Sequence, residues 1–364
     1  MHKRTLNEIL VSVILPVYNM QDYLAECLDS VVNQTLKEIE IICINDASED
    51  DSLKILERYA QDDERLQIFT IEHAGLAAAR NFGFSKAIGN YVIFWDSDDY
   101  FELDALEKMY KRADKLDADL CICNAYDFDH KTGKHISHNY IRKPYPETET
   151  FSIDDCPDRI FQITSSNCWN RLLRREFLIE NDISFPVGDL LEDEIFSMLI
   201  LSLSKRICLL KERLIHYRVN RPGSIMNKFE AVENIAVKGY HECYKQMKSR
   251  GLLERDDIRK SFVDRICGLY LYQLKQYKSL ETFKENYKKM ISDDDIYVDL
   301  WNPEWEKTSN VKKYTDAREM SPEEYIFIMY RELNTQNGFN KAEIGILKSK
   351  LKKITESQNR GLSD

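Results

Sequence analysis

The sequence predicts an α/β fold: a mostly parallel sheet flanked by helices, followed by a helical C-terminal region. Two observations support this fold class. Short β-branched runs alternate with helical runs from residue 11 to about 124, and from about 228 onward only helical spacing is present. Such alternation is typical of parallel sheets covered by helices on both faces. We therefore expect a first domain at 1–227, with halves at about 1–124 and 150–227, and a helical region at 228–364.

Buried strands are expected where short apolar runs occur. They are Val11–Val17, Ile39–Asn45, Leu66–Ile71 and Tyr91–Trp95. Between and after them, apolar residues at helical spacing predict helices over 21–32, 52–59, 76–87 and 104–115. Ligands of such sheets bind outside the carboxyl ends of the strands. The residues that directly follow the four runs are therefore the candidates for a functional site.

The middle of the chain is less regular. The segment 125–149 is polar and without a clear period, which predicts an insertion or a long loop. Beyond it, the pattern predicts a helical stretch around Trp169, a helix over 192–204 and a strand over 213–219.

A two-heptad apolar seam lies near the C-terminus. Its members are Ile344, Leu347, Leu351 and Ile354. Two heptads are too short to pair stably alone, so packing against the body of the protein is favoured over self-association as a homo-oligomer. The Lys-rich stretch 341–353 is also a candidate for peripheral contact with a membrane.

Composition excludes several classes of protein. The net charge of −11 repels nucleic acid, so we expect no nucleic-acid partner. Nine cysteines without a CxxC pair are typical of reduced thiols in a cytoplasmic protein, without disulfides or a zinc site. No apolar run approaches the roughly 18 to 20 residues of a membrane-spanning helix. The apolar stretch 9–17 resembles a secretion signal, but no small-residue cleavage site follows it, and we interpret it as a strand.

The strongest candidate site is Asp96-Ser97-Asp98-Asp99, directly after the fourth run. In an extended chain Asp96 and Asp98 point to the same side, so both can reach one hard cation, or a cation and a neighbouring hydroxyl. Oxygen ligands with few protein donors suit Mg²⁺ or Mn²⁺ bridging to phosphate. The alternative is that these residues only cap the helix at 104–115.

Two further motifs follow strands or begin helices. Asn45-Asp46-Ala47-Ser48 ends the second run, where Asp46 can accept a hydrogen bond from a nucleobase; the alternative is a turn with Ser48 capping the next helix. Arg80 follows the turn at Gly75, and its guanidinium can meet a phosphate or one of the aspartates, unless it is an ordinary surface arginine.

A third acidic motif, Glu192-Asp193-Glu194, begins the helix over 192–204. Acidic residues are favoured there by the helix dipole, which is the simpler interpretation. Adjacent carboxylates also repel one another, which can raise the pKa of one toward values useful for proton abstraction. No glycine-rich phosphate loop is present, because Tyr18-Asn19-Met20-Gln21-Asp22 follows the first strand.

Together the motifs resemble the family 2 glycosyltransferases with a GT-A fold. The resemblance covers about the first 115 residues closely and extends to about 227 through Trp169-Asn170-Arg171-Leu172, Glu192-Asp193-Glu194 and His216-Tyr217-Arg218. Two positions depart from the family pattern: His73 stands where a smaller polar residue is common, and Ala47 where glycine is common.

The resemblance implies an inverting transfer of a hexose or N-acetylhexosamine from a nucleotide diphosphate, with UDP favoured, to an acceptor hydroxyl in surface polysaccharide or glycan synthesis. It implies that donor-binding residues are Pro16, Val17, Tyr18, Asp46, Arg80, Asp96, Ser97, Arg218 and Ser224. Arg221 could also contact the diphosphate. It assigns Asp98 to Mn²⁺ or Mg²⁺, Asp193 as the catalytic base, and Trp169 and Glu192 to the acceptor. His216 is more consistent with a buried strand histidine.

The implied acceptor is a glycan, lipid-linked or protein-linked, and the implied location is the cytoplasm, including the inner face of the cell membrane. A non-catalytic member that binds a nucleotide sugar or a partner protein is the alternative. It is disfavoured because every carboxylate that the mechanism needs is present. A phosphotransferase or phosphatase is disfavoured because it would need an aspartate after the first strand, where Tyr18-Asn19 stands.

Overall fold

The computed structural model describes residues 9–188, 191–223, 235–277, 279–291, 302, 304–305, 309–335 and 347–354. Contacts divide the chain into two units. Unit 1 comprises Met1–Ser224 and Glu242–Leu253, and unit 2 comprises Ile225–His241 and Glu254–Asp364.

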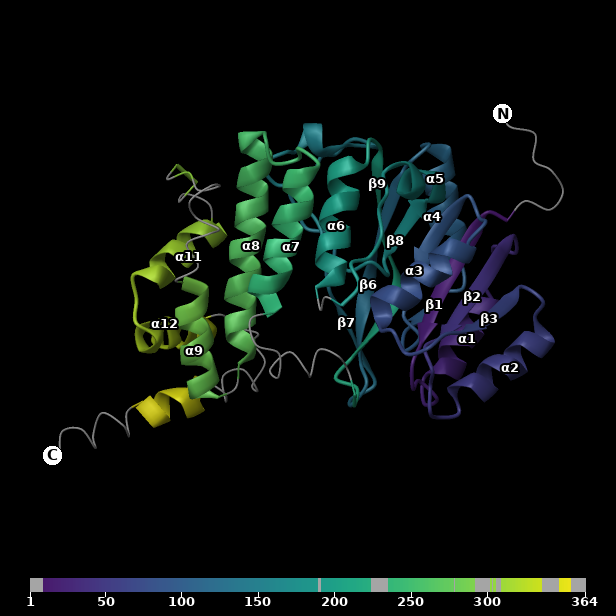
Figure 1. Cartoon of the computed structure of the whole chain (residues 1–364), viewed down its shortest axis with the longest axis horizontal. Helices are drawn as coiled ribbons and strands as arrows, with labels where there is room; N and C mark the ends of the chain where they lie inside the picture. Colours follow the sequence, from purple (N-terminus) through teal and green to yellow (C-terminus); the bar gives the residue numbers. More distant parts are fainter. Residues whose placement is uncertain are drawn as a thin grey trace. The chain divides into compact units, whose positions relative to one another are not determined.

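Unit 1 contains a nine-stranded sheet and its flanking helices (Figure 1). Its strands are β1 (Val11–Val17), β2 (Ile39–Asn45), β3 (Leu66–Thr70), β4 (Tyr91–Phe94), β5 (Tyr100–Phe101), β6 (Leu120–Asp129), β7 (Lys134–Ser137), β8 (Arg171–Arg174) and β9 (Ile207–Val219). Its helices are α1 (Leu24–Val32), α2 (Ser52–Asp62), α3 (Leu76–Lys86), α4 (Ala105–Lys115), the 3₁₀ turn η1 (Ile153–Asp155), α5 (Arg175–Glu180) and α6 (Glu192–Leu203). The α/β fold class predicted from the sequence is confirmed.

The strand order is β3-β2-β1-β4-β8-β6-β9-β5, with β7 paired to β6. The first four strands pair in parallel, as expected, and β6 is also parallel to β9. The pairings β4–β8, β6–β8, β5–β9 and β6–β7 are antiparallel, so the second half of the sheet is mixed. Because β8 is antiparallel to both β4 and β6, strands β1, β2, β4, β6 and β9 all end at the same edge of the sheet.

Alternate residues of the parallel strands pack against helices on opposite faces. Val13 and Leu15 of β1 belong to a core that includes Leu28 of α1 and Met109 of α4. The other face carries α3, whose Gly83 lies so close to β1 that an added Cβ would meet Ile14 Cγ2 at 2.6 Å. Phe94 of β4 continues this second core by packing edge-on against Phe185 and Phe196. Burial on both faces explains why these strands are continuous apolar runs.

Two expectations for the middle of the chain are wrong. Residues 125–149 are not simply a loop, because β6 runs to Asp129 and forms an antiparallel hairpin with β7. Trp169 does not lie in a helix; it lies in the turn before β8, and the nearby helix is α5. At the end of β6, Tyr126 and Phe128 alternate with Asp127 and Asp129, and the four residues of β7 are all exposed, so neither part of the hairpin has the apolar run that marked the other strands.

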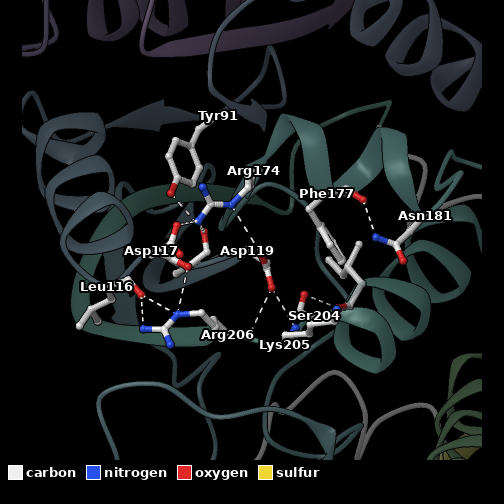
Figure 2. A network of polar contacts seen from close by, with 12 residues as sticks. Tyr91, Leu116, Asp117, Asp119, Arg174, Phe177, Asn181, Ser204, Lys205 and Arg206 are labelled. Carbon is white, nitrogen blue, oxygen red and sulfur yellow. Dashed lines mark hydrogen bonds and ion pairs between the residues drawn. The ribbon is translucent and has the colours of Figure 1, made fainter. Parts of the chain in front are cut away.

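A polar network joins the starts of several elements, at the edge where β6 and β9 begin (Figure 2). Asp119 Oδ2 accepts hydrogen bonds from the backbone N–H groups of Lys205 and Arg206, at 2.9 and 3.1 Å. Arg206 donates to the backbone oxygen of Leu116, and the guanidinium of Arg174 lies 5.4 Å from the centre of the Tyr91 ring. The network therefore fixes the register between β8, β6 and β9.

Replacing Asp119 with alanine should reduce the free energy of unfolding by roughly 1–3 kcal/mol, because two backbone donors lose a charged acceptor. Urea denaturation measures this change. Asp117→Asn is the matched control: the Asp117 side chain is 78% exposed and also pairs with Arg174, and asparagine tolerates the φ of +48° at this position, so loss of the ion pair should cost less than about 1 kcal/mol. Equal effects of the two substitutions would contradict the anchoring role of Asp119.

Unit 2 is helical in its described residues and includes α8 (Asp256–Gln276), α9 (Leu280–Ile291), α11 (Ser309–Arg318), α12 (Pro322–Thr335) and a helical segment at 347–354; α7 (Ile235–Ser249) contributes to both units. Leu351 and Ile354 line one apolar cavity together with Phe327 of α12, which agrees with packing of the terminal seam against the body of the protein. Ile344 lies outside the described residues. None of the described helices combines the length and apolar character needed to cross a membrane.

Candidate active site

The polar residues singled out in the sequence gather where β1, β2 and β4 end. Val17, Asn45 and Phe94 terminate three neighbouring parallel strands. Ser97 is 4% exposed, and its hydroxyl donates to the backbone oxygen of Pro16 at 2.7 Å, which ties the end of β1 to the segment after β4. This edge corresponds to the place where sheets of this type bind ligands.

Asp46 organises the turn before α3. Its carboxylate accepts hydrogen bonds from the backbone N–H of Ala74 at 2.7 Å and of Gly75 at 3.0 Å, and it lies 2.9 Å from Nδ1 of His73. Gly75 has φ of +86°, a conformation that residues with a Cβ rarely adopt. The Asp46 side chain therefore shapes this loop, while lone pairs on its oxygens leave capacity for a further donor.

Tyr18 and His73 form a stacked pair beside Asp46. Their ring centres are 4.3 Å apart with an interplanar angle of 25°, and Tyr18 is 40% exposed. Val17, which precedes Tyr18 at the end of β1, is fully buried. Ser48 does not cap α2, because the N-cap residue of that helix is Asp51. The backbone N–H of Ser48 donates to Asn45 Oδ1, as in the turn that was the alternative interpretation of this motif.

Arg80 joins two acidic motifs that are far apart in the sequence. Its Nη2 donates to Asp96 Oδ1 at 2.8 Å, and its Nη1 donates to Asp193 Oδ1 at 2.7 Å, across 113 residues of chain. Glu192 Oε1 is 4.0 Å from the same Nη1. The arginine is 1% exposed and lies over the Phe185 ring at 5.1 Å, so it is not an ordinary surface arginine.

Burial changes the protonation of the carboxyl groups around Arg80. It raises the pKa of Asp96 to about 6, although the adjacent Arg80 acts in the opposite direction. Burial, followed by repulsion from Asp193, raises the pKa of Glu192 to about 7. Both groups thus change charge near neutral pH, which is common where carboxyl groups share a catalytic cleft.

Two arginines from the end of β9 surround Asp98. Arg221 Nε donates to Asp98 Oδ2, and the two side chains are only 9% and 13% exposed. Arg218 Nε donates to the backbone oxygen of Asp98 at 2.7 Å, and its Nη2 pairs with Glu26 of α1. Asp99 is fully buried and accepts the backbone N–H of Arg218 at 2.7 Å. The acidic segment does not cap α4, because that helix begins after Asp104 without any side-chain cap.

The donor set fits a hard divalent cation. Arg80 and Arg221 each contact one oxygen of these carboxylates, Asp96 Oδ1 and Asp98 Oδ2, and the two aspartate side chains are 22% and 13% exposed. In the part of the chain that the structure describes, no group of three or more His, Cys, Asp or Glu side chains is arranged to hold a metal. Mg²⁺ typically takes one or two carboxylates and completes its coordination with phosphate oxygens and water. Asp98, with Asp96 beside it, supplies such a pair.

The remaining predicted site residues lie outside this cluster or beneath it. Trp169 is 1% exposed and packs between Tyr140 and Tyr217, so its side chain is part of the core in this structure. His216 is 9% exposed, stacks on Tyr100 and contacts Glu102 at 3.0 Å, as expected of a buried strand histidine. Ser224 lies outside the described residues.

Sequence reasoning missed one contributor to the cluster and gave another no role of its own. Glu26 lies on an amphipathic helix, where a partly exposed glutamate is unremarkable, and only the tertiary structure brings it to Arg218. Asp99 belongs to the candidate motif, for which helix capping was the alternative; its side chain is fully buried and accepts the Arg218 backbone N–H. Burial of an acidic residue directly after an apolar run gave no separate signal in the sequence.

Residues 12–180 match the family model described as Glycosyl transferase family 2. Glycosyltransferase GlyG of Streptococcus pneumoniae is 30% identical over 229 residues, which cover 60% of this chain and 73% of GlyG. The chain therefore belongs to glycosyltransferase family 2, as the sequence motifs predicted.

Other relatives are longer than this chain. Glycosyltransferase GlyA of Streptococcus pneumoniae is 35% identical over 219 residues, which cover 59% of this chain and 31% of GlyA. The poly(ribitol-phosphate) beta-glucosyltransferase of Bacillus spizizenii is 31% identical over 222 residues, with 60% of this chain and 33% of that protein covered. The chain thus spans about a third of the length of these two curated relatives.

Solved structures support the fold. S. aureus TarS 1-349 in complex with UDP-GlcNAc superposes with a TM-score of 0.53 at 20% identity, covering 97% of this chain and 92% of that chain. Mannosyltransferase PcManGT from Pyrobaculum calidifontis, solved with GDP-Man and Mn²⁺, has a TM-score of 0.50 at 16% identity and covers 85% of each chain. At these identities the likeness shows the fold alone.

Proposed function

We propose that this protein is an inverting, metal-dependent glycosyltransferase that moves a hexose or N-acetylhexosamine from a UDP-sugar to an acceptor hydroxyl. One observation carries the proposal: the buried Arg80 guanidinium bridges Asp96, beside the donor-side carboxylates, to Asp193 at the start of α6. The Arg80 guanidinium thereby holds Asp96, on the donor side, at a fixed distance from the Asp193 carboxylate. A displacement reaction requires such fixed positions for the groups that act on the donor and on the acceptor.

The donor side is formed by the ends of β1, β2 and β4. Tyr18 is half-exposed and stacked on His73, and it offers a ring face to a nucleobase. Asp46 fixes the adjacent loop and can accept a base N–H, while Asp96 lies within reach of a ribose hydroxyl. The floor of the donor side is formed by Pro16, Val17 and Ser97. These residues make no polar contact with the donor in this proposal, because the Ser97 hydroxyl already donates to the backbone oxygen of Pro16.

The diphosphate side is formed by Asp98, Arg218 and Arg221. Asp98 would hold a Mn²⁺ or Mg²⁺ ion, which, when bound, stabilises the negative charge that develops on the departing diphosphate. Arg218 and Arg221 are buried cations at the same place and can bind phosphate oxygens. Arg218 is held in position by Asp99, Glu26 and the Asp98 backbone.

The acceptor side begins at α6. Asp193 is 32% exposed, and its 2.7 Å contact with the Arg80 guanidinium fixes the position of the carboxylate at the start of α6. In the proposed reaction Asp193 removes the proton from the acceptor hydroxyl as that oxygen attacks the anomeric carbon opposite the diphosphate. Glu192 lies beside it and contacts the acceptor, and Trp169 acts indirectly by supporting Tyr217 from within the core.

Relatives indicate the broader process. One is named for glucosylation of poly(ribitol-phosphate), and TarS was solved with UDP-GlcNAc. We therefore propose that the acceptor is a glycan or polyol-phosphate chain of the cell surface, assembled on a lipid or protein carrier. A lipid carrier would place the enzyme in the cytoplasm at the inner face of the membrane, with the Lys-rich stretch 341–353 as the contact.

Incubation with a panel of UDP-sugars tests this function. At least one UDP-sugar should raise the melting temperature in Mn²⁺ and be slowly hydrolysed when no acceptor is present, because ligands that bind the folded state stabilise it. GDP-mannose is the comparison donor. Binding without hydrolysis or transfer to any acceptor would favour the non-catalytic alternative, and absence of binding by every nucleotide sugar would overturn the proposal.

Asp98→Ala should weaken UDP binding in the presence of Mn²⁺ by roughly ten- to a hundredfold, since one charged contact to the cation is lost. Calorimetric titration of UDP with and without Mn²⁺ measures the effect. Asp62→Ala removes an exposed aspartate of α2 and serves as the control. Unchanged affinity in the Asp98 variant would place the metal elsewhere.

A further inference from the structure

We infer that Arg221 is an internal counter-ion of Asp98 that competes with the divalent cation and is released to the diphosphate when metal and nucleotide bind together. This inference rests on the proposed function, because it takes Asp98 as the carboxylate that holds the metal. It concerns how Arg221 sets the affinity for the divalent cation and the order in which the cation and the nucleotide bind.

The first supporting observation is the direct contact. Arg221 Nε donates to Asp98 Oδ2, so the carboxylate proposed to bind the cation is already paired with a positive charge. Both side chains are largely buried, at 9% and 13% exposure, so water screens the pair weakly. A divalent cation that approaches Asp98 therefore meets a guanidinium within the same contact distance.

The second observation is that Arg221 can stay near the site after it leaves Asp98. Its guanidinium lies 5.5 Å from the centre of the Tyr23 ring, whose face favours a cation. Its Nη1 donates to the neighbouring backbone oxygen of Pro222 at 3.1 Å. A small rotation of the Arg221 side chain can thus exchange the Asp98 carboxylate for a phosphate oxygen, and the guanidinium stays in the site.

The third observation distinguishes Arg221 from Arg80 and Arg218, the two other buried arginines of this cluster. Arg218 binds the Asp98 backbone oxygen and the Glu26 carboxylate, not the Asp98 side chain. Arg80 binds Asp96 and Asp193. Among the arginines of the described cluster, Arg221 alone occupies the Asp98 carboxylate, so the competition with metal falls on this residue.

The inference predicts coupled binding. Metal alone must break the buried contact between Arg221 and Asp98, which costs binding free energy, so Mn²⁺ alone should bind weakly. UDP supplies phosphate oxygens that accept Arg221 at the same moment, so Mn²⁺ and UDP should strengthen each other's binding by the same factor.

The test is Mn²⁺ titration followed by electron paramagnetic resonance of the free ion, with and without UDP, which needs no turnover. Arg221→Gln should tighten the binding of Mn²⁺ alone by about tenfold or more, because a competing charge at contact distance is removed, and it should reduce the strengthening by UDP. Arg213→Gln removes one positive charge from the same strand, away from Asp98, and should change neither quantity. Circular dichroism verifies the fold of each variant.

Asp98→Asn separates the inference from the proposed function. The metal assignment stands if the wild type binds Mn²⁺ with UDP and Asp98→Asn abolishes that binding. If Arg221→Gln then leaves the affinity for Mn²⁺ alone unchanged or weaker, the counter-ion role is wrong. If Asp98→Asn binds Mn²⁺ and UDP like the wild type, the metal assignment itself fails. If Arg213→Gln tightens Mn²⁺ as much as Arg221→Gln does, general charge rather than the specific pair is responsible, and the inference is overturned.

Discussion

Arg80→Ala should produce the largest loss of stability of any substitution in the site, lowering the free energy of unfolding by roughly 3–5 kcal/mol and abolishing turnover. The guanidinium is 1% exposed and neutralises both Asp96 and Asp193. Its removal leaves a gap in the core and two partly buried carboxylates without their shared cation, which is more costly than loss of a surface ion pair. Urea denaturation monitored by circular dichroism measures the change.

Arg80→Lys is the matched variant, because it keeps the charge but has a single ammonium in place of the planar fork. One ammonium cannot reproduce the two separate contacts at 2.7 and 2.8 Å. We expect intermediate stability and a turnover that remains strongly reduced. Wild-type turnover in Arg80→Lys would show that charge alone suffices and that the bridging geometry is dispensable.

Asp193→Asn should lower turnover by roughly 10²- to 10⁴-fold while UDP-sugar binding is retained, the usual size of the loss of a general base. Asparagine keeps the shape and can still accept a hydrogen bond from Arg80, so the fold should survive. Steady-state kinetics with calorimetry of donor binding separate these effects. Turnover close to the wild-type value would move the base to another residue.

Glu192→Gln is the matched control, because it removes the adjacent carboxylate. The pKa of Glu192 is raised to about 7, so this group loses its negative charge as the pH falls through that value. In the wild type we expect turnover to change as the pH passes the Glu192 pKa of about 7. In Glu192→Gln this change should be absent from the pH profile. The loss of turnover in Glu192→Gln at pH 8 should stay below about tenfold. A larger loss than in Asp193→Asn would identify Glu192 as the base.

The parallel half of the fold could be predicted from the sequence because its strands are buried on both faces. Val11–Val17 and Ile39–Asn45 match β1 and β2 at both ends, since continuous apolar runs end where the chain reaches solvent at the sheet edge. The β6–β7 hairpin was missed because its strands present one polar side. Tyr126 and Phe128 alternate with aspartates, and without a long apolar run this alternation resembled a loop.

The site was predictable in part for the same reason. Residues directly after strand ends were identified by position, and these include Asp46, Asp96 and Asp98. The connection of Arg80 to Asp193 was not predictable from spacing, because it depends on how α3 and α6 pack in the folded chain. The resemblance to family 2 supplied the proposed role of Asp193, while the pairing of Asp98 with Arg221 required the structure.

The Asp119 network and the candidate site lie at opposite edges of the sheet, and this separation has a practical consequence. The network clamps the beginnings of the strands, whereas the chemistry is proposed at their far ends, so the scaffold's robustness and its substrate preference depend on different sets of residues. An engineer could therefore reinforce the clamp first and then diversify the cleft, using the gained stability to tolerate disruptive changes of specificity.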